Sequence, residues 1–297
     1  MANKRTIKMN NKKDLLCLGA GYTAQTMMKL YPANQMWGTT RTPDKATAIQ
    51  DVSAVPIIFT GEEPSEDLSP ILREAENILI SISPKLDGGP LLKHHEEDIL
   101  ANKNLKWIGY LSTVGVYGNH DGEWVDETSE TRPGSDRSLW RKKTEDQWLA
   151  LHKEHGIPVH IFRLPGIYGR GRGPQEKLKT GKARRINKPG QVFNRAHVED
   201  IAMVLEASCH QPNPGAIYNI ADDEPAPPQD VLAYAAELLD LDVPPLIEFE
   251  DAEMSKMAKS FYSDNKRVSN KRIKEELGIT LQYPTYREGI KASILKA

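Results

Sequence analysis

The stretch Asp14-Leu15-Leu16-Cys17-Leu18-Gly19-Ala20-Gly21-Tyr22-Thr23-Ala24 contains an apolar run that ends in Gly-x-Gly-x-x-Ala. This pattern predicts a strand, a tight turn and a helix. Gly19 permits the turn, Gly21 lets the backbone approach phosphates closely, and the small Ala24 lets the helix pack against the strand. Because the N–H groups at the helix start face an anion, we predict dinucleotide binding by Gly19, Ala20, Gly21, Tyr22 and Thr23. The alternative is an ordinary strand–helix turn.

The composition of the 297-residue chain excludes several classes of partner. The formal net charge is −2, which gives no electrostatic reason to expect nucleic acid or an anionic membrane. The chain has only two cysteines, Cys17 and Cys209, so we expect a reducing compartment and no disulfide framework. No apolar run approaches the roughly 20 residues that span a bilayer. We therefore expect a cytoplasmic protein whose basic residues 1–13 form a mobile tail.

Apolar runs alternate with polar, helix-compatible segments along the first part of the chain. The runs after the glycine turn are Gln35–Thr40, Val55–Phe59, Ile78–Ile82, Trp107–Leu111 and Val159–Leu164. This alternation predicts an α/β fold with a doubly wound, Rossmann-type parallel sheet. From Pro165 onward glycine, proline and basic residues dominate, as in Gly169–Pro174, which indicates a smaller substrate-binding region.

Later segments indicate that this smaller region is discontinuous. Val192–Ala207 is typical of a strand leading into a helix, and Ala216–Ala221 of one more buried strand, so we expect the chain to return to the main sheet. Helices are expected near Asp230–Leu239 and Asn270–Leu277. The predicted organisation is a tail of residues 1–13, an NAD(P)-binding domain of residues 14–165 and 191–221, and a substrate-binding region of residues 166–190 and 222–297.

Four strings occur in the order typical of the atypical and extended short-chain dehydrogenase/reductases. They are Leu111-Ser112-Thr113-Val114-Gly115-Val116-Tyr117-Gly118, Arg163-Leu164-Pro165-Gly166-Ile167-Tyr168-Gly169, His197-Val198-Glu199-Asp200-Ile201-Ala202 and Tyr218-Asn219-Ile220-Ala221. Over residues 14 to 221 the chain thus resembles this family, which includes NAD-dependent epimerases and dehydratases. The resemblance implies a nicotinamide cofactor and hydride-transfer chemistry.

The family's central acid/base is a tyrosine four residues before a lysine, and this chain lacks it. Counting back from Lys143 gives Leu139, and counting back from Lys142 gives Ser138. Leucine has no proton to transfer, and serine is a far weaker acid than a phenol. The usual proton relay is therefore absent.

The resemblance still implies roles for several residues near the missing tyrosine. Thr113 corresponds to the hydroxyl residue that binds a substrate oxygen beside the nicotinamide, although a strand-end threonine is the plain alternative. Lys143 is expected to hold the cofactor ribose. For the unassigned proton donor the candidates are Tyr168, Tyr117 and a water molecule.

Further cofactor contacts are expected near the ends of the apolar runs Gln35–Thr40, Ile78–Ile82 and Val159–Leu164. Where NAD-specific proteins place an acid for the ribose hydroxyls, this chain has Thr40 and Arg41, so Arg41 is predicted to pair with the 2′-phosphate of NADP; a solvated loop cation is the alternative. The resemblance places Ser81, Ile82, Ser83, Pro84, Leu164 and Pro165 beside the cofactor, and Tyr117, Arg195 and His197 beside the substrate. An ordinary strand exit is the alternative for Ser81–Pro84. Asp200 is either a helix cap or a ligand.

Two further charged segments each have a functional interpretation and a simpler one as a solvated face. His94 and Asp98 would share one helical face, but no third ligand is identifiable nearby, so we expect a solvated face and no metal site. The basic run comprises Lys177, Lys179, Lys182, Arg184 and Arg185. It is either a solvated face or a contact for an anionic substrate.

The sequence thus predicts an NADP(H)-binding oxidoreductase or epimerase/dehydratase-type enzyme that acts on a small polar or nucleotide-sugar-like substrate. NAD is the second choice of cofactor. A non-catalytic NADP(H) sensor is the alternative, and the missing tyrosine favours it. A homodimer through Leu91–Asn102 and Leu139–His155 is also expected from the resemblance.

Overall fold

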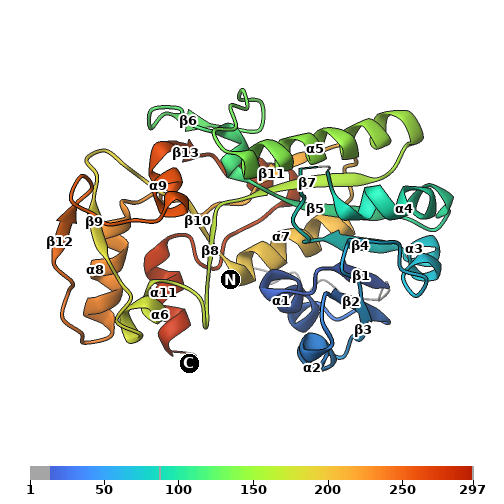
Figure 1. The fold of residues 1–297 in the computed structure, drawn as a ribbon, viewed down its shortest axis with the longest axis horizontal. Coiled ribbons are helices and arrows are strands. Elements are labelled where there is room, and N and C mark those ends of the chain that lie inside the picture. The colour runs from blue at the N-terminus through green and yellow to red at the C-terminus, as the bar shows by residue number, and fades with distance from the viewer. Residues whose placement is uncertain (1–13, 87, 296–297) are drawn as a thin grey trace, which may run out of the picture.

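The computed structural model describes residues 14–86 and 88–295. The predicted tail, residues 1–13, lies outside the described residues. A seven-stranded sheet, in which every pair of neighbouring strands is parallel, forms the centre (Figure 1). Its strands, in spatial order, are β11 (Ile217–Asn219), β7 (Val159–Leu164), β5 (Trp107–Thr113), β4 (Asn77–Ile80), β1 (Leu15–Leu18), β2 (Met36–Thr40) and β3 (Val55–Ile58). The predicted doubly wound, Rossmann-type α/β fold is therefore confirmed.

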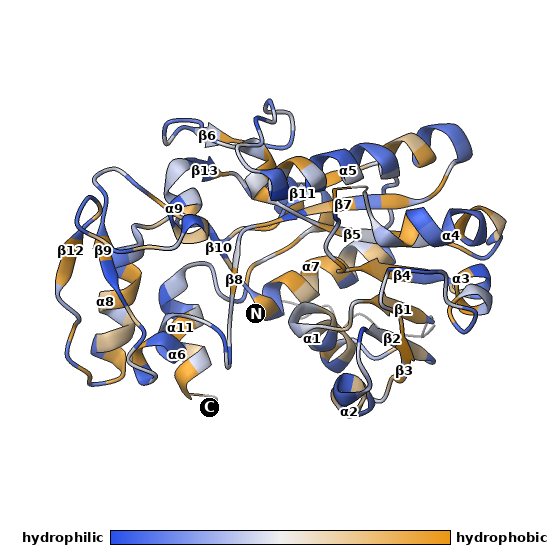
Figure 2. Cartoon of the chain, viewed as in Figure 1, coloured by the Kyte–Doolittle hydropathy of each residue, from blue (hydrophilic) through white to orange (hydrophobic). Residues whose placement is uncertain are grey.

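Helices cover both faces of this sheet. Their bounds are α1 (Tyr22–Leu30), α2 (Ala46–Gln50), α3 (Ser69–Glu74), α4 (Pro90–Ala101), α5 (Asp136–His155), α7 (Val198–His210) and α10 (Lys271–Leu277), with short 3₁₀ helices η1 (Pro43–Lys45) and η2 (Val114–Tyr117). Leu15 and Cys17 of β1 pack in one core cluster with residues of α1 and α7, whereas Leu16 and Leu18 pack in another with residues of α3, α4 and α5. Both faces of the central strands β1, β4, β5 and β7 are buried, which explains their continuous apolar runs in Figure 2, whereas Val55 and Ile58 of the edge strand β3 are exposed.

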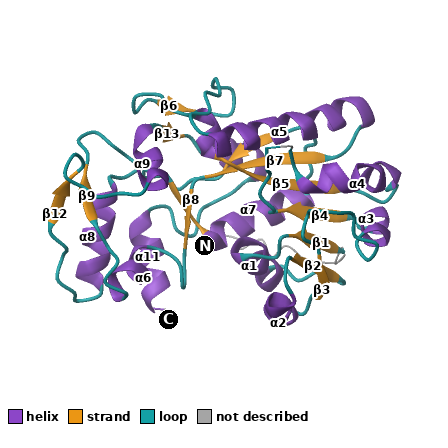
Figure 3. Cartoon of the chain, in the orientation of Figure 1, coloured by secondary structure: helices purple, strands orange, loops and turns teal. Residues whose placement is uncertain are grey.

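The remaining elements lie mainly beside the sheet, at the left of Figure 3. We call residues 166–190 and 222–295 the small lobe. Its elements are β8 (Gly166–Tyr168), α6 (Pro174–Lys179), β9 (Arg185–Asn187), α8 (Pro228–Leu238), β12 (Leu246–Glu248), α9 (Lys256–Ser263), β13 (Arg267–Val268) and α11 (Tyr286–Leu295), together with α10. Within this group β12 pairs with β9. Two strands link it to the rest of the chain, since β10 (Arg195–His197) pairs with β8, and β6 (Trp124–Val125) pairs with β13.

Among the described residues, no helix is long and apolar enough to cross a membrane. Cys17 and Cys209 are both buried and are not joined in a disulfide.

A buried ion pair fixes α5 against the sheet. Arg163 of β7 and Glu145 of α5 meet at 2.8 Å between Nη2 and Oε2, and Ser112 of β5 donates a hydrogen bond to Glu145. Burial alone would lower the pKa of Arg163, but the hydrogen bond and charge of Glu145 raise this pKa overall. Arg163 also lies over the Tyr117 ring, with 4.8 Å from Cζ to the ring centroid. One guanidinium thus joins β7, α5 and the segment after β5.

Replacing Arg163 by methionine should cost about 3–5 kcal/mol of unfolding free energy, because it leaves the Glu145 carboxylate buried without its partner. Urea unfolding near neutral pH measures this loss. Arg132→Met is the control, since Arg132 pairs with Glu130 while its side chain is 55% exposed, and exposed pairs contribute at most about 1 kcal/mol. Equal losses in the two variants would contradict the special contribution of the buried pair.

Candidate cofactor and substrate site

The glycine turn between β1 and α1 is in contact with the segment that follows β4. Gly19 has φ +82°, a conformation that disfavours residues with a Cβ atom. A Cβ atom there would lie 2.9 Å from Ile82 Cγ2 and 3.1 Å from the Ile82 nitrogen. Thr39 Oγ1 accepts a hydrogen bond of 2.8 Å from the Gly19 N–H. The turn is therefore held between the ends of β2 and β4, as the sequence predicts for a Rossmann turn.

The first turn of α1 is built to receive an anion. Gly21 precedes the helix and provides no side-chain cap, and the first turn contains no acidic residue. A Cβ atom on Gly21 would meet only a backbone oxygen at 4.0 Å, so the space beside the turn is open. The N–H groups at the start of α1 and the helix dipole both favour negative charge here. These residues fit the diphosphate of a dinucleotide.

The other predicted cofactor residues lie at the same edge of the sheet. This edge is formed by the carboxyl ends of parallel strands, and the chain order reverses between β1 and β4, where α/β proteins bind ligands. The residues are Thr40 at the end of β2 and Arg41 directly after it, Ser81, Ile82, Ser83 and Pro84 after β4, and Leu164 and Pro165 at the end of β7. Arg41 is exposed and makes no hydrogen bond or ion pair with the described part of the chain.

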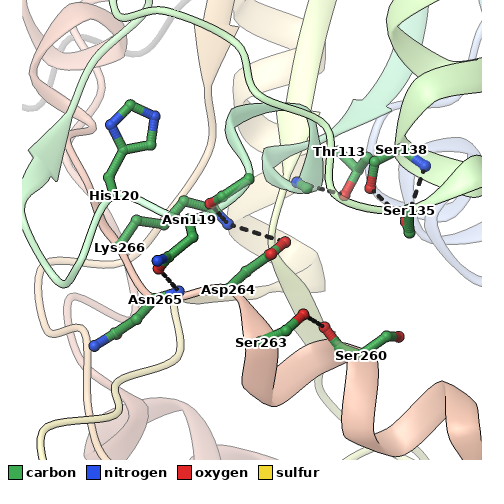
Figure 4. A network of polar contacts seen from close by, with 12 residues as sticks. Thr113, Asn119, His120, Ser135, Ser138, Ser260, Ser263, Asp264, Asn265 and Lys266 are labelled. Carbon is green, nitrogen blue, oxygen red and sulfur yellow. Dashed lines mark hydrogen bonds and ion pairs between the residues drawn. The ribbon is translucent and has the colours of Figure 1, made fainter.

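Thr113 ends β5 and caps the short helix η2. Its Oγ1 accepts a hydrogen bond of 3.1 Å from the Gly115 N–H, which leaves its own O–H able to donate. Figure 4 shows Ser135 and Ser138 beside Thr113. Ser135 Oγ lies 3.1 Å from Ser138 Oγ. The surface beside Thr113 therefore carries the hydroxyl groups of Ser135 and Ser138.

The cation that reaches this edge from α5 is Arg141. Its guanidinium donates to the Leu111 carbonyl and, at 3.1 Å, to Ser83 Oγ. Lys143 is exposed, and Lys142 pairs with Asp146. The structure thus does not support the predicted ribose-holding role of Lys143, because the helix directs Arg141 instead toward the ends of β4 and β5. Glu145 lies one turn after Arg141 and belongs to the buried face of α5. The two side chains therefore lie on the same side of this helix.

Tyr117 and Tyr168 are both buried away from this hydroxyl surface. Tyr117 is fully buried, and its hydroxyl donates to Asn219 Oδ1 at 2.8 Å. Tyr168 packs in a small-lobe core with Tyr286, and its hydroxyl lies 3.4 Å from the Thr285 carbonyl oxygen. Burial raises the pKa of both hydroxyls, which is opposite to the change that an acid/base at neutral pH needs. The structure therefore does not support either tyrosine as the proton donor.

The predicted substrate residues Arg195 and His197 lie where β10 meets the small lobe. Arg195 Nη1 donates to the Phe193 and Ala226 carbonyls at 2.9 and 3.1 Å. Burial lowers the pKa of Arg195, although the charge of Asp222 opposes this change. Burial raises the pKa of the Asp222 carboxyl to about 8, and Arg195 offsets only part of the effect. The buried carboxyl of Asp222, which the sequence did not indicate, lies near Arg195, and the Asp222 N–H donates a hydrogen bond of 2.7 Å to the Arg195 carbonyl, which holds β10 against the chain that follows β11.

His197 lines a small cavity of about 110 Å³ together with Arg170, Glu199, Tyr283, Ala292 and Ser293. Its Nδ1 accepts a hydrogen bond from the Glu199 N–H at 3.3 Å, so the ring caps α7. Asp200 accepts hydrogen bonds from the Gln282 and Tyr283 N–H groups at 2.8 and 3.0 Å. Both side chains therefore tie α7 to the segment before α11, and neither reaches the hydroxyl surface through these contacts.

The predicted solvated face at His94 and Asp98 is wrong. Asp98 is 6% exposed and His95 1%, because α4 is kinked at His95 and turns this face inward. His95 Nδ1 lies 2.8 Å from Asp98 Oδ2, and Ser65 N–H donates to His95 Nε2 at 3.1 Å. The cluster is a structural anchor between α4 and the segment before α3. Among the described residues no group of three or more histidine, cysteine or acidic side chains is placed to hold a metal ion.

The basic run divides into two parts. Lys177, Lys179 and Lys182 are exposed, whereas Arg184 and Arg185 bond to the Glu253 and Gln229 carbonyls. The sequence interpretation as a solvated face therefore suits the lysines better than the arginines.

Sequence reasoning also missed Lys266. This residue is 6% exposed and donates to the Gly118 carbonyl at 2.7 Å. Asp264 Oδ2 lies 3.8 Å from its Nζ, and burial lowers the pKa of Lys266. In Figure 4 this pair lies across from Thr113 and next to Asn119. A lysine in a polar chain of ordinary composition gives no sequence signal of such burial.

Comparison with known proteins supports the fold over the whole length of the chain. No family model matches. The structure of a functionally unknown conserved protein from Silicibacter pomeroyi DSS is 51% identical, with a TM-score of 0.88, covering 96% of this chain and 99% of that one. Protein YeeZ of Escherichia coli is 27% identical over 288 residues, which are 92% of this chain and 97% of YeeZ.

Enzyme structures share the same architecture at lower identity. UDP-glucuronic acid 4-epimerase from Bacillus cereus in complex with NAD is 16% identical, with a TM-score of 0.74, covering 95% of this chain and 99% of the epimerase. The predicted resemblance is therefore confirmed in the fold. The chain belongs to the same family as the Silicibacter pomeroyi protein and has the fold that the Bacillus cereus epimerase also has.

Proposed function

We propose that this protein binds NADP(H) and transfers hydride between the nicotinamide and a small polar or nucleotide-sugar-like substrate. One observation carries this proposal: the glycine turn, Thr113 and Arg141 meet at the edge formed by the carboxyl ends of β1, β4 and β5. When bound, the nicotinamide supplies or accepts the hydride. The residues of the chain bind the cofactor, orient the substrate and hold its oxygen.

Each group at this edge has a separate role in the proposal. The start of α1 binds the diphosphate, and Arg141 donates hydrogen bonds to the ribose beside the nicotinamide. The planar guanidinium of Arg141 only donates hydrogen bonds, so its role in the proposal is to position the ribose. Thr113 donates its O–H to the substrate oxygen. Since neither Tyr117 nor Tyr168 lies on this surface, we assign proton transfer to a water molecule bound among the hydroxyls of Ser135 and Ser138.

A non-catalytic NADP(H) sensor is the second candidate. The observation that favours it is the composition of α5, which presents Ser138 and Arg141 toward the site and contains no tyrosine. Both candidates require cofactor binding, so binding alone does not separate them. Consumption of NADPH with a panel of carbonyl compounds and nucleotide sugars does.

Thr113→Val should lower kcat/KM for any substrate found in that panel by about two orders of magnitude, because it removes a hydrogen bond made in the transition state. NADPH affinity should stay unchanged, since the hydroxyl faces the substrate. Single-turnover hydride transfer and calorimetric titration measure the two quantities.

Thr60→Val is a matched control. Thr60 Oγ1 accepts a hydrogen bond from the N–H two residues later, at 3.3 Å, as Thr113 does, but it follows the edge strand β3. Normal turnover in Thr113→Val would contradict the assigned site. If wild type turns over none of the panel while binding NADPH, the sensor candidate is favoured.

The proposed preference for NADP(H) over NAD(H) depends on Arg41. A charge-assisted contact with the 2′-phosphate is worth about 1.5–3 kcal/mol, or roughly 10- to 100-fold in affinity. Titration of wild type and Arg41→Ala with NADPH and NADH tests this. Equal affinities in wild type, or an undiminished preference in the variant, would contradict it.

We further propose that residues 14–165 and 191–221 act as the cofactor domain of a cytoplasmic homodimer. Two buried cysteines that are not joined in a disulfide suit a reducing compartment. In the dimer, α4 and α5 would pair with the same helices of a second copy, and Leu139 of α5 is 39% exposed. Light scattering at micromolar protein should give the mass of two chains, and a monomer mass would exclude this interface.

A further inference from the structure

A small-lobe loop reaches across to the start of α1. The loop, Gly169–Gly173, connects β8 to α6. The Tyr22 hydroxyl donates to the Arg170 carbonyl at 2.9 Å, and Arg172 lies over the Tyr22 ring, with 5.5 Å from Cζ to the ring centroid. Tyr22 is the first residue of α1, directly after Gly21. The loop therefore lies beside the backbone groups that we assign to the diphosphate.

Internal bonds hold this loop in place. Gly169 and Arg172 exchange two backbone hydrogen bonds, of 2.8 and 3.1 Å, and Gln175 Nε2 donates to the Gly169 carbonyl at 2.9 Å. Gly169 has φ +156°, and a Cβ atom there would lie 2.5 Å from the Tyr22 hydroxyl oxygen. The contact between the loop and α1 thus requires glycine at this position.

The charges around Tyr22 also belong to this contact. Burial is the largest effect on the pKa of Tyr22 and raises it, while the charge of Arg172 lowers it and that of Glu199 raises it. Arg170 and Arg172 form no ion pair within the part of the chain that the structure describes. Their positive charge is therefore not neutralised by a neighbouring carboxylate, although Glu199 is near.

We propose that Arg172 is a cofactor-binding residue that contacts the diphosphate of the dinucleotide from the small-lobe side. This inference rests on the proposed function and deepens it. The Tyr22 ring keeps the guanidinium within side-chain reach of the helix start, and a guanidinium binds phosphate oxygens in pairs. The diphosphate is then held by backbone N–H groups on one side and by an arginine of the other lobe on the opposite side.

The test is calorimetric titration of the full chain with NADPH, NADH and ADP-ribose, which share the diphosphate, and with 2′-AMP, which lacks it. Arg172→Ala should weaken the first three by roughly 10- to 100-fold alike and leave 2′-AMP unchanged. Arg41→Ala should weaken only NADPH and 2′-AMP. Lys179→Ala removes an exposed charge from the adjacent helix α6 and should change each affinity by less than about twofold.

Two further variants separate the direct contact from a structural effect. Arg172→Lys keeps the charge but not the paired geometry, so it should lose less affinity than alanine. Tyr22→Phe keeps the ring and removes only the bond to the loop carbonyl, so it should behave like Arg172→Lys or better. Thermal unfolding should be unchanged in Arg172→Ala, because this side chain is exposed.

The outcomes distinguish this inference from the function on which it rests. If wild type binds NADPH and Arg172→Ala binds it equally well, or no worse than Lys179→Ala does, Arg172 is only a surface cation and the inference is wrong. A loss confined to NADPH would also overturn it, because the contact would then be with the 2′-phosphate. If wild type binds none of the ligands, both the proposed function and this inference fail.

Discussion

The Glu145–Arg163 ion pair is the interaction on which the rest of the site depends. It lies beneath Thr113 and joins α5 to the centre of the sheet, because Ser112 donates to the same carboxylate. A buried carboxylate without its guanidinium would be strongly destabilising, so the rotation of α5 about its axis has one favourable setting. That setting directs Ser138 and Arg141 toward the strand ends and leaves Lys143 exposed.

This setting has a chemical consequence. In the family that the chain resembles, the proton relay pairs a tyrosine with a lysine, both of which have adjustable pKa values. Here the same edge offers the hydroxyls of Thr113, Ser135 and Ser138 and the guanidinium of Arg141, which only donates hydrogen bonds. In the proposed binding mode the residues for the cofactor are present at this edge, whereas α5 contains no tyrosine for acid/base chemistry. The proposed enzyme would therefore take its proton from a water molecule. The alternative, a cofactor sensor, needs no proton transfer.

Much of the fold was predictable from the sequence, and less of the site. Strands buried on both faces appear as continuous apolar runs, so β7 was predicted at its observed bounds, Val159–Leu164. The glycine turn follows from backbone sterics, which are local. The local sequence does not predict which face of α5 turns toward the sheet, because this orientation depends on Arg163, the partner of Glu145 on the distant strand β7. His95 and Asp98 are likewise buried in a helix that is kinked at His95, and no residue type in this segment predicts the kink.

The distribution of positive charge links these observations. The net charge of −2 is uninformative, because what matters is where the arginines lie. Arg41 follows β2, Arg172 lies over Tyr22 at the start of α1, and Arg141 reaches the ends of β4 and β5. These elements are neighbours along one edge of the sheet, so in the proposed binding mode the three cations meet in turn the phosphorylated ribose, the diphosphate and the second ribose. Because salt screens the attraction between these guanidinium groups and the phosphates, cofactor affinity should fall as ionic strength rises.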